Sequence, residues 1–140
     1  MEPLIDDVAR TPNGSGGRFT EAERKALARQ VVKLLELWQL DKAKASEMLG
    51  LSANTRTTLS RYAQGAALAD QRDLLDRVGN LLGIHKSLRL LFPHNRDLAY
   101  RWPTTANRAL GGRRPVDVIA EEGLPGLVAL RGYLDHLRGQ

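Results

Sequence analysis

Large apolar residues recur along this chain at spacings of three and four, the period that places side chains on one face of an α-helix. The clearest stripes are Leu27, Val31, Leu34, Leu35 and Trp38; Leu74, Leu75, Val78, Leu81 and Leu82; Ile84, Leu88, Leu91 and Phe92; and Leu127, Leu130, Leu134 and Leu137. No segment alternates apolar and polar residues over four or more positions, as a half-buried strand would. The sequence therefore predicts an all-α fold.

Capping residues mark where the first helices begin and end. Thr20 lies three residues before Glu23, which is the spacing of a capping box, and it opens the first stripe. Asp41 and Gly50 are typical cap and stop residues for a short second helix that buries Ala45, Met48 and Leu49. A third helix is expected to start after Ser52 and to run to Gln64, with Gly65 as its left-handed stop.

In the second half of the chain, glycine and proline punctuate the stripes. We expect Gly83 to end one helix and Pro93 to end the next, with a turn-rich segment around Pro103. Pro115 is expected to open a short helix that points Val116 and Ile119 inward. A closing helix carries the last leucine stripe almost to the carboxyl end.

Composition limits the classes of protein that the chain could be. Its 140 residues suit one compact domain or two very small ones that share a core, and the absence of cysteine excludes disulfides and thiolate zinc sites. Residues 1–17 end in a Pro-Asn-Gly-Ser-Gly-Gly run that predicts a disordered tail. Since no apolar run is long enough to cross a bilayer and the first residues lack the pattern of a signal peptide, we expect a cytoplasmic protein with no membrane partner.

Residues 41–65 have the pattern of a helix-turn-helix, the motif whose second helix enters the major groove of DNA. The net charge of +5 permits DNA binding. The first candidates are Arg56 and Arg61, because arginine binds guanine with two hydrogen bonds. The full set of DNA-binding candidates is Ser52, Asn54, Arg56, Thr57, Thr58, Ser60 and Arg61. The alternative is an ordinary helical hairpin with a solvated polar face.

The turn of this motif departs from the usual pattern. Arg56 stands six residues after Gly50, where an apolar anchor is usual, and Leu59 is the first apolar residue available. We therefore expect the turn or the recognition helix to be about three residues longer than standard.

Catalytic and metal-binding patterns are absent from the sequence. His85, His94 and His136 lie in separate segments, and no nucleophile elbow, phosphate-binding glycine loop or dinucleotide fingerprint occurs. The segment Gly-Gly-Arg-Arg-Pro at 111–115 offers only a weak anion site. We predict a protein that is not an enzyme and that needs no metal or other cofactor.

Residues 41–140 resemble the Xre/MbcA/ParS family of antitoxins, which carry a toxin-binding domain. The resemblance lies in RYAQG, in DLLDRVGNLLGIHKSLRLLFP and in the long segment that begins YRWPTTANRALGGRRPVD. Its most specific pieces are Trp102 to Asn107, Arg113 to Asp117, and Tyr133-Leu134 followed by Arg138-Gly139. The unmatched first 17 residues and the lengthened recognition region are departures from the family pattern.

The resemblance implies a type II antitoxin whose toxin has a RES domain that consumes NAD⁺ or transfers ADP-ribose from it. The antitoxin would block the toxin's active site and, as a homodimer, bind operator DNA and repress its own operon. On this reading residues 18–68 are the helix-turn-helix DNA-binding domain and residues 69–140 the helical toxin-binding domain. The implied toxin contacts are Trp102, Asn107, Arg113, Arg114, Tyr133, Leu137 and Arg138.

Two other functions remain open from the residues. The first is a transcriptional regulator with a carboxyl-terminal domain that dimerises or senses a ligand and binds no toxin. The second is a small enzyme that uses Arg113 and Arg114 on a phosphorylated substrate. The implied toxin contacts also have ordinary structural roles, since Trp102 and Tyr133 suit packing and Asn107 suits a helix cap.

Overall fold

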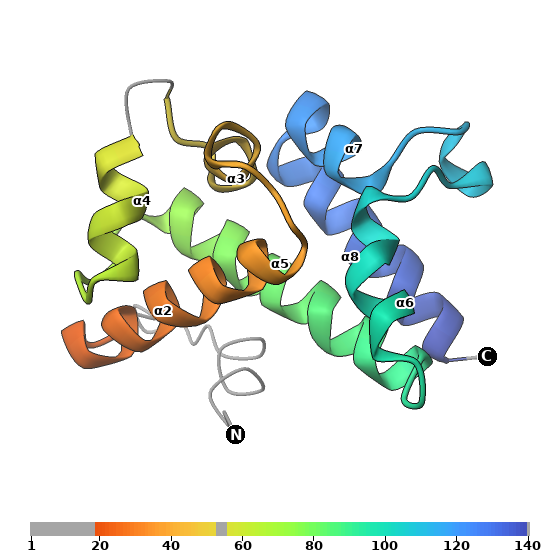
Figure 1. Ribbon diagram of the computed structural model, residues 1–140, viewed down its shortest axis with the longest axis horizontal. Coiled ribbons are helices and arrows are strands. Elements are labelled where there is room, and N and C mark those ends of the chain that lie inside the picture. The colour runs from red at the N-terminus through yellow and green to blue at the C-terminus, as the bar shows by residue number, and fades with distance from the viewer. Residues whose placement is uncertain (1–18, 53–55, 140) are drawn as a thin grey trace.

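The computed structural model describes residues 19–52 and 56–139, and every regular element within these ranges is a helix (Figure 1). The all-α prediction is confirmed. The predicted tail at 1–17 lies outside the described residues, as does Asn54. The helices are α2 (Glu21–Leu37), α3 (Lys42–Leu49), α4 (Arg56–Ala63), α5 (Arg72–Leu91), α6 (Arg96–Arg101), η2 (Trp102–Thr104), η3 (Arg108–Leu110), α7 (Pro115–Glu122) and α8 (Leu124–Arg138).

The predicted caps of the first two helices are present. The Thr20 hydroxyl accepts a hydrogen bond from the Glu23 amide at 3.1 Å, and the Glu23 carboxylate accepts one from the Thr20 amide at 2.8 Å. At α3, the Asp41 carboxylate accepts from the Lys44 amide at 2.8 Å, and Gly50 ends the helix in the left-handed conformation with φ +71°. These local bonds explain why α2 and α3 begin where the sequence predicts.

The prediction that Gly83 ends a helix is wrong, because α5 runs without a break through that residue. A Cβ atom at position 83 would lie 2.5 Å from the Cζ atom of Arg131, which belongs to α8. Glycine at this position therefore allows an arginine side chain of α8 to approach the backbone of α5, and it does not stop the helix. The two expected helices are one helix of 20 residues.

The segment around Pro103 also contains more helix than the sequence predicts. The turn-rich region includes α6, capped by the Asn95 side chain, which accepts a hydrogen bond from the Leu98 amide at 3.0 Å. Two short 3₁₀ turns, η2 and η3, follow. The short helix predicted at Pro115 is confirmed as α7, with Val116 and Ile119 buried.

Helix α5 is the central element of the fold. It packs against α2 and α3 on one side and against α6 and α8 on the other (Figure 1). It runs parallel to α8, since Gly83 lies against Arg131 and the Ser87 hydroxyl binds Asp135 one turn further along both helices. The early and late segments of the chain are thus assembled on one long helix.

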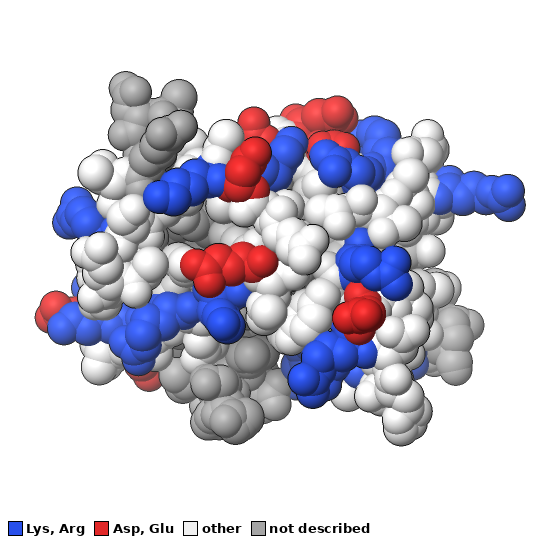
Figure 2. Space-filling view, in the orientation of Figure 1, with Lys and Arg blue, Asp and Glu red and all other residues white. Residues whose placement is uncertain are grey.

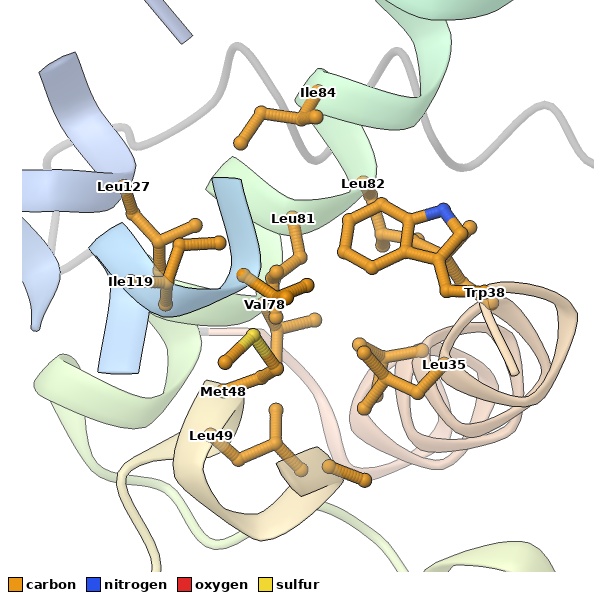
Figure 3. Packing of buried hydrophobic residues seen from close by; sticks show 14 of the residues in the cluster. Leu35, Trp38, Met48, Leu49, Val78, Leu81, Leu82, Ile84, Ile119 and Leu127 are labelled. Carbon is orange, nitrogen blue, oxygen red and sulfur yellow. The ribbon is translucent and has the colours of Figure 1, made fainter. Parts of the chain in front are cut away.

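The buried side chains form one continuous cluster. Figure 3 shows Leu35 of α2, Met48 of α3, Val78 of α5 and Ile119 of α7 gathered in one region of the core. Trp38, at the end of α2, packs in the same cluster and is 1% exposed. No helix in the described ranges is long and apolar enough to cross a membrane.

Candidate partner-binding surfaces

The helix-turn-helix candidate consists of α3, the turn that starts at Gly50, and α4. Leu59 and Tyr62 of α4 are buried, so Leu59 supplies the apolar anchor that follows the turn. Thr57 and Arg61, four residues apart, lie exposed on the opposite face of α4, and Thr58 and Ser60 are half-buried. This helix contains no acidic residue, so its outward face offers only hydroxyl, amide and guanidinium groups.

Two of the sequence-predicted DNA contacts need separate comment. Ser52 lies exposed in the turn between α3 and α4. Arg56 is the first described residue of α4, and its side chain lies outside what the structure describes. The candidate face of α4 therefore depends on Thr57, Ser60 and Arg61.

The predicted toxin contacts Trp102, Asn107 and Tyr133 have clear packing roles. Trp102 and Tyr133 are half-buried and pack against the core. The Asn107 side chain caps η3 by accepting a hydrogen bond from the Ala109 amide at 2.9 Å. Each of these residues therefore has a structural role in the carboxyl-terminal half of the chain, whatever else it binds.

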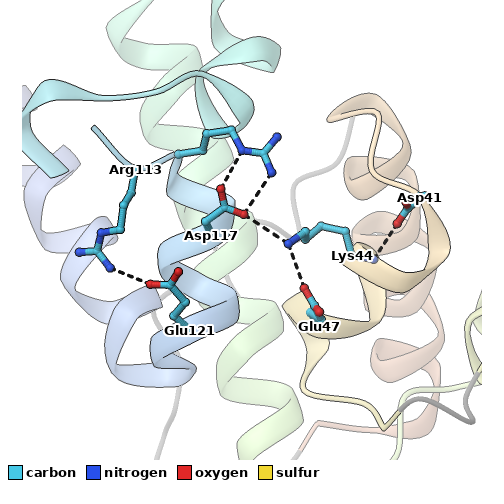
Figure 4. A network of polar contacts seen from close by, with 7 residues as sticks. Asp41, Lys44, Glu47, Arg113, Asp117 and Glu121 are labelled. Atoms are coloured by element: carbon cyan, nitrogen blue, oxygen red, sulfur yellow. Dashed lines mark hydrogen bonds and ion pairs between the residues drawn. The ribbon is translucent and has the colours of Figure 1, made fainter. Parts of the chain in front are cut away.

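Arg113 and Arg114 are already paired with carboxylates of α7 (Figure 4). The Arg113 guanidinium donates to Glu121 and Glu122, at 3.1 Å each. The Arg114 guanidinium donates to both carboxylate oxygens of Asp117, at 2.8 and 3.1 Å. An anion would have to compete with these carboxylates, which disfavours a phosphate-binding enzyme site at this loop.

Asp117 also connects α7 to α3. The Lys44 ammonium donates to the Asp117 carboxylate at 3.3 Å and lies 3.1 Å from Glu47. The bidentate bond from Arg114, together with the bond from Lys44, lowers the pKa of Asp117 to about 2. Sequence reasoning missed this contact, because no local pattern indicates a pair 73 residues apart.

At the end of α8, Arg138 belongs to a second polar group. Its guanidinium donates to the fully buried Ser87 hydroxyl at 3.0 Å, and that hydroxyl donates to Asp135 at 3.2 Å. The group ties the last turn of α8 to α5. Arg138 thus has a structural role in addition to the toxin contact implied by the resemblance.

Helix α8 exposes apolar side chains on two opposite sides, together with the charged residues Asp135 and Arg138. Val128 is 52% exposed and Leu137 is 39% exposed, whereas Leu127, Leu130 and Leu134 are buried. The small residues Ala129 and Gly132 are exposed between them, and a Cβ atom at position 132 would meet nothing within 4 Å. An exposed apolar side chain such as Val128 is a candidate contact for a protein partner.

Sequence reasoning named Leu137 as a contact but missed Val128, which is exposed on the opposite side of α8. The signal is present in the sequence, since Val128 falls outside the inward stripe of Leu127, Leu130 and Leu134. An apolar residue outside the buried stripe of a helix is a candidate partner contact.

The histidines do not assemble into a metal site, and the described ranges contain no group of three or more metal-ligating side chains. His85 is partly buried and stacks on Tyr100 with 5.4 Å between ring centres. Burial lowers the pKa of His85 to about 4, with a further contribution from the charge of Arg89. These contacts indicate a packing role for His85.

Comparison with known proteins identifies the second half of the chain. No curated protein matches the chain. The family model for the antitoxin Xre/MbcA/ParS C-terminal toxin-binding domain matches residues 87–139. The matched range runs from the last turns of α5 to the end of α8, and it includes every residue implied as a toxin contact. The chain therefore carries, over residues 87–139, a toxin-binding domain of the Xre/MbcA/ParS antitoxin family.

Proposed function

We propose that this protein is the antitoxin of a type II toxin–antitoxin pair, that it blocks the active site of a RES-domain toxin, and that it represses its own operon. The match of residues 87–139 to an antitoxin toxin-binding domain carries this proposal. The RES identity of the toxin rests on the resemblance of residues 41–140 to the Xre/MbcA/ParS family. Both activities belong in the cytoplasm, where NAD⁺ and operator DNA are found.

The exposed side chains of α8 support a steric mode of inhibition. Val128 and Leu137 offer apolar contacts, and Tyr133 and Arg138 lie on the same helix, with side chains of the types that dominate binding hot spots. Seated across the mouth of an enzyme, this helix would exclude the substrate without any chemistry of its own. The antitoxin therefore needs no catalytic group.

The arrangement of α3 and α4 supports operator binding. Arg61 and Thr57 lie exposed on one face of α4, with side chains suited to base edges and phosphate oxygens. A single short helix reads only a few base pairs, so two copies related by a two-fold axis would supply the second half-site. We therefore propose a homodimer on DNA.

Toxin neutralisation is tested with the protein encoded beside this chain. We expect the two proteins to co-purify, and NAD⁺ consumption by the isolated toxin to fall to background once the antitoxin is in molar excess. Full toxin activity at saturating antitoxin would overturn the proposal. A chain that binds DNA but forms no complex with its neighbour would be a transcriptional regulator without a toxin.

A further inference from the structure

Helix α2 carries a row of basic side chains on its outward face. Lys25, Arg29 and Lys33 follow one another at intervals of four residues, and all three are exposed. Four-residue spacing places them along one side of the helix, over about 12 Å of its axis. Figure 2 shows Lys and Arg side chains in a line over α2.

Within the described ranges, most of the positive charge in this row has no acidic partner at ion-pair distance. Lys25 has an acidic neighbour at ion-pair distance, Glu21 at 4.0 Å. Among the residues that the structure describes, Arg29 and Lys33 form no ion pair. Glu36 lies exposed on the same helix, three residues beyond Lys33, so carboxylates stand at both ends of the row and the basic charge is concentrated in its middle.

The position of the row relative to α4 indicates its partner. Helix α2 packs directly against α4, and the two helices lie side by side in Figure 1. A duplex that accepted α4 in its major groove would extend past the neighbouring helix, where its phosphates carry one negative charge for about every 1.7 Å of axis. Because α2 lies directly beside α4, the row is close to where these phosphates would run, and its charge is complementary to theirs.

We infer that Lys25, Arg29 and Lys33 bind the phosphate backbone of the duplex that α4 engages. This inference rests on the proposed operator binding and adds a second, sequence-independent contact to it. Such contacts fix the register of a protein on DNA and make its affinity sensitive to salt. They account for part of the affinity that one short recognition helix cannot supply.

The experiment measures binding by fluorescence anisotropy to two labelled duplexes of about 30 base pairs, roughly three helical turns. One duplex is taken from the region upstream of the reading frame, and the other has a random sequence. Three phosphate contacts should contribute about 2.7 to the magnitude of the slope of log affinity against log salt concentration. Over a fourfold increase in salt concentration, that slope corresponds to a loss of affinity of about 40-fold. The triple variant Lys25→Gln, Arg29→Gln, Lys33→Gln should lose this slope on both duplexes, because glutamine keeps the helix but removes the charge.

The matched control removes the same charge elsewhere. Arg96, Arg101 and Arg108 are exposed near α6 and η3, and changing all three to glutamine should leave most of the slope intact. Glu36→Gln should have the opposite effect to the triple variant and tighten binding to both duplexes. Because that variant removes a negative charge, its gain cannot be mistaken for the loss expected from a damaged fold.

Four outcomes would overturn the inference. If the unmodified protein binds neither duplex, operator binding and this inference both fail. If the unmodified protein binds DNA and the triple variant keeps the full salt dependence of affinity, the inference fails while operator binding stands. An equal loss of slope in the control variant would indicate a general effect of net charge. A triple variant that loses toxin binding and keeps DNA binding would assign the row to the toxin.

Discussion

Helices α2 and α8 resemble each other on their inward faces and differ on their outward faces. Both bury leucines at helical spacing, for example Leu27 of α2 and Leu127 of α8. Outward, α2 presents Lys25, Arg29 and Lys33, whereas α8 presents Val128 and the small residues around it. The difference teaches that one core supports two surfaces of unlike chemistry, a basic row on α2 suited to DNA and exposed apolar side chains on α8 suited to protein.

The two surfaces are not carried by independent bodies. The Arg77 side chain of α5 packs over Gly50, at the turn after α3, and reaches Gly123, between α7 and α8. A Cβ atom at Gly50 would lie 2.7 Å from the Arg77 Cζ atom. Because Gly50 also has a positive φ, any side chain at that position would disturb both the helix-turn-helix candidate and its contact with α5.

The largest expected effect comes from a change in the shared core. Met48→Ala removes a fully buried side chain between α3 and α5, and we expect it to lower the free energy of unfolding by about 2–5 kcal/mol. Trp38 and Trp102 report on the two halves separately, so denaturant titrations of single-tryptophan variants should give one shared, lowered midpoint. Separate midpoints would mean that the halves unfold independently, and Lys42→Ala on the exposed side of α3 is the control.

A charge on the α8 face should separate the two surfaces. Val128→Glu is expected to weaken toxin binding by about 2 kcal/mol or more, roughly 30-fold, because an unpaired carboxylate would be buried at the interface. Calorimetry with the toxin measures this loss, and operator binding should not change. Leu37→Glu places the same charge on an exposed leucine of α2 and should leave toxin binding intact. Equal effects of the two substitutions would show that α8 is not the toxin-binding face.

The converse separation is expected at α4. Arg61→Ala should weaken operator binding by about 1–3 kcal/mol if its guanidinium binds a guanine edge, and it should leave toxin neutralisation unchanged. Anisotropy on the upstream duplex measures the first effect and the NAD⁺ assay measures the second. Arg72→Ala, at the exposed start of α5, is the matched control. A variant that lost both functions would point to a folding defect.

The smallest effect is expected where the two halves meet through charge. Asp117→Asn should lower stability at neutral pH by up to about 1 kcal/mol, since the carboxylate is partly exposed. The folded-state pKa of Asp117 lies near 2, below its usual value of 3.8, so its contribution is present above about pH 4 and is lost as the pH falls toward 2. Melting temperatures of the two proteins should therefore converge at low pH. A difference that is independent of pH would contradict this assignment, and Lys44→Gln isolates the part that bridges α3 and α7.

Local patterns predicted most of the helices but not how they pack. The capping box at Thr20 and the left-handed stop at Gly50 were predictable, because each depends only on residues within one turn. Gly83 was misread as a stop, because its actual neighbour, Arg131, lies on another helix. Of the candidate contacts, Arg61 was predicted from its position on a polar helix face, whereas Val128 was missed although it falls outside the inward stripe of α8.

By itself, the sequence determined the all-α class, the starts of α2, α3 and α7, and most of the inward-facing residues of the predicted helices, since these follow from periodicity and local hydrogen bonding. Tertiary structure alone decided that α5 is continuous, that Lys44 pairs with Asp117, and that Ser87 holds the end of α8. These features join segments about 50 to 70 residues apart, and such contacts arise from how side chains fit in three dimensions, which no local spacing encodes.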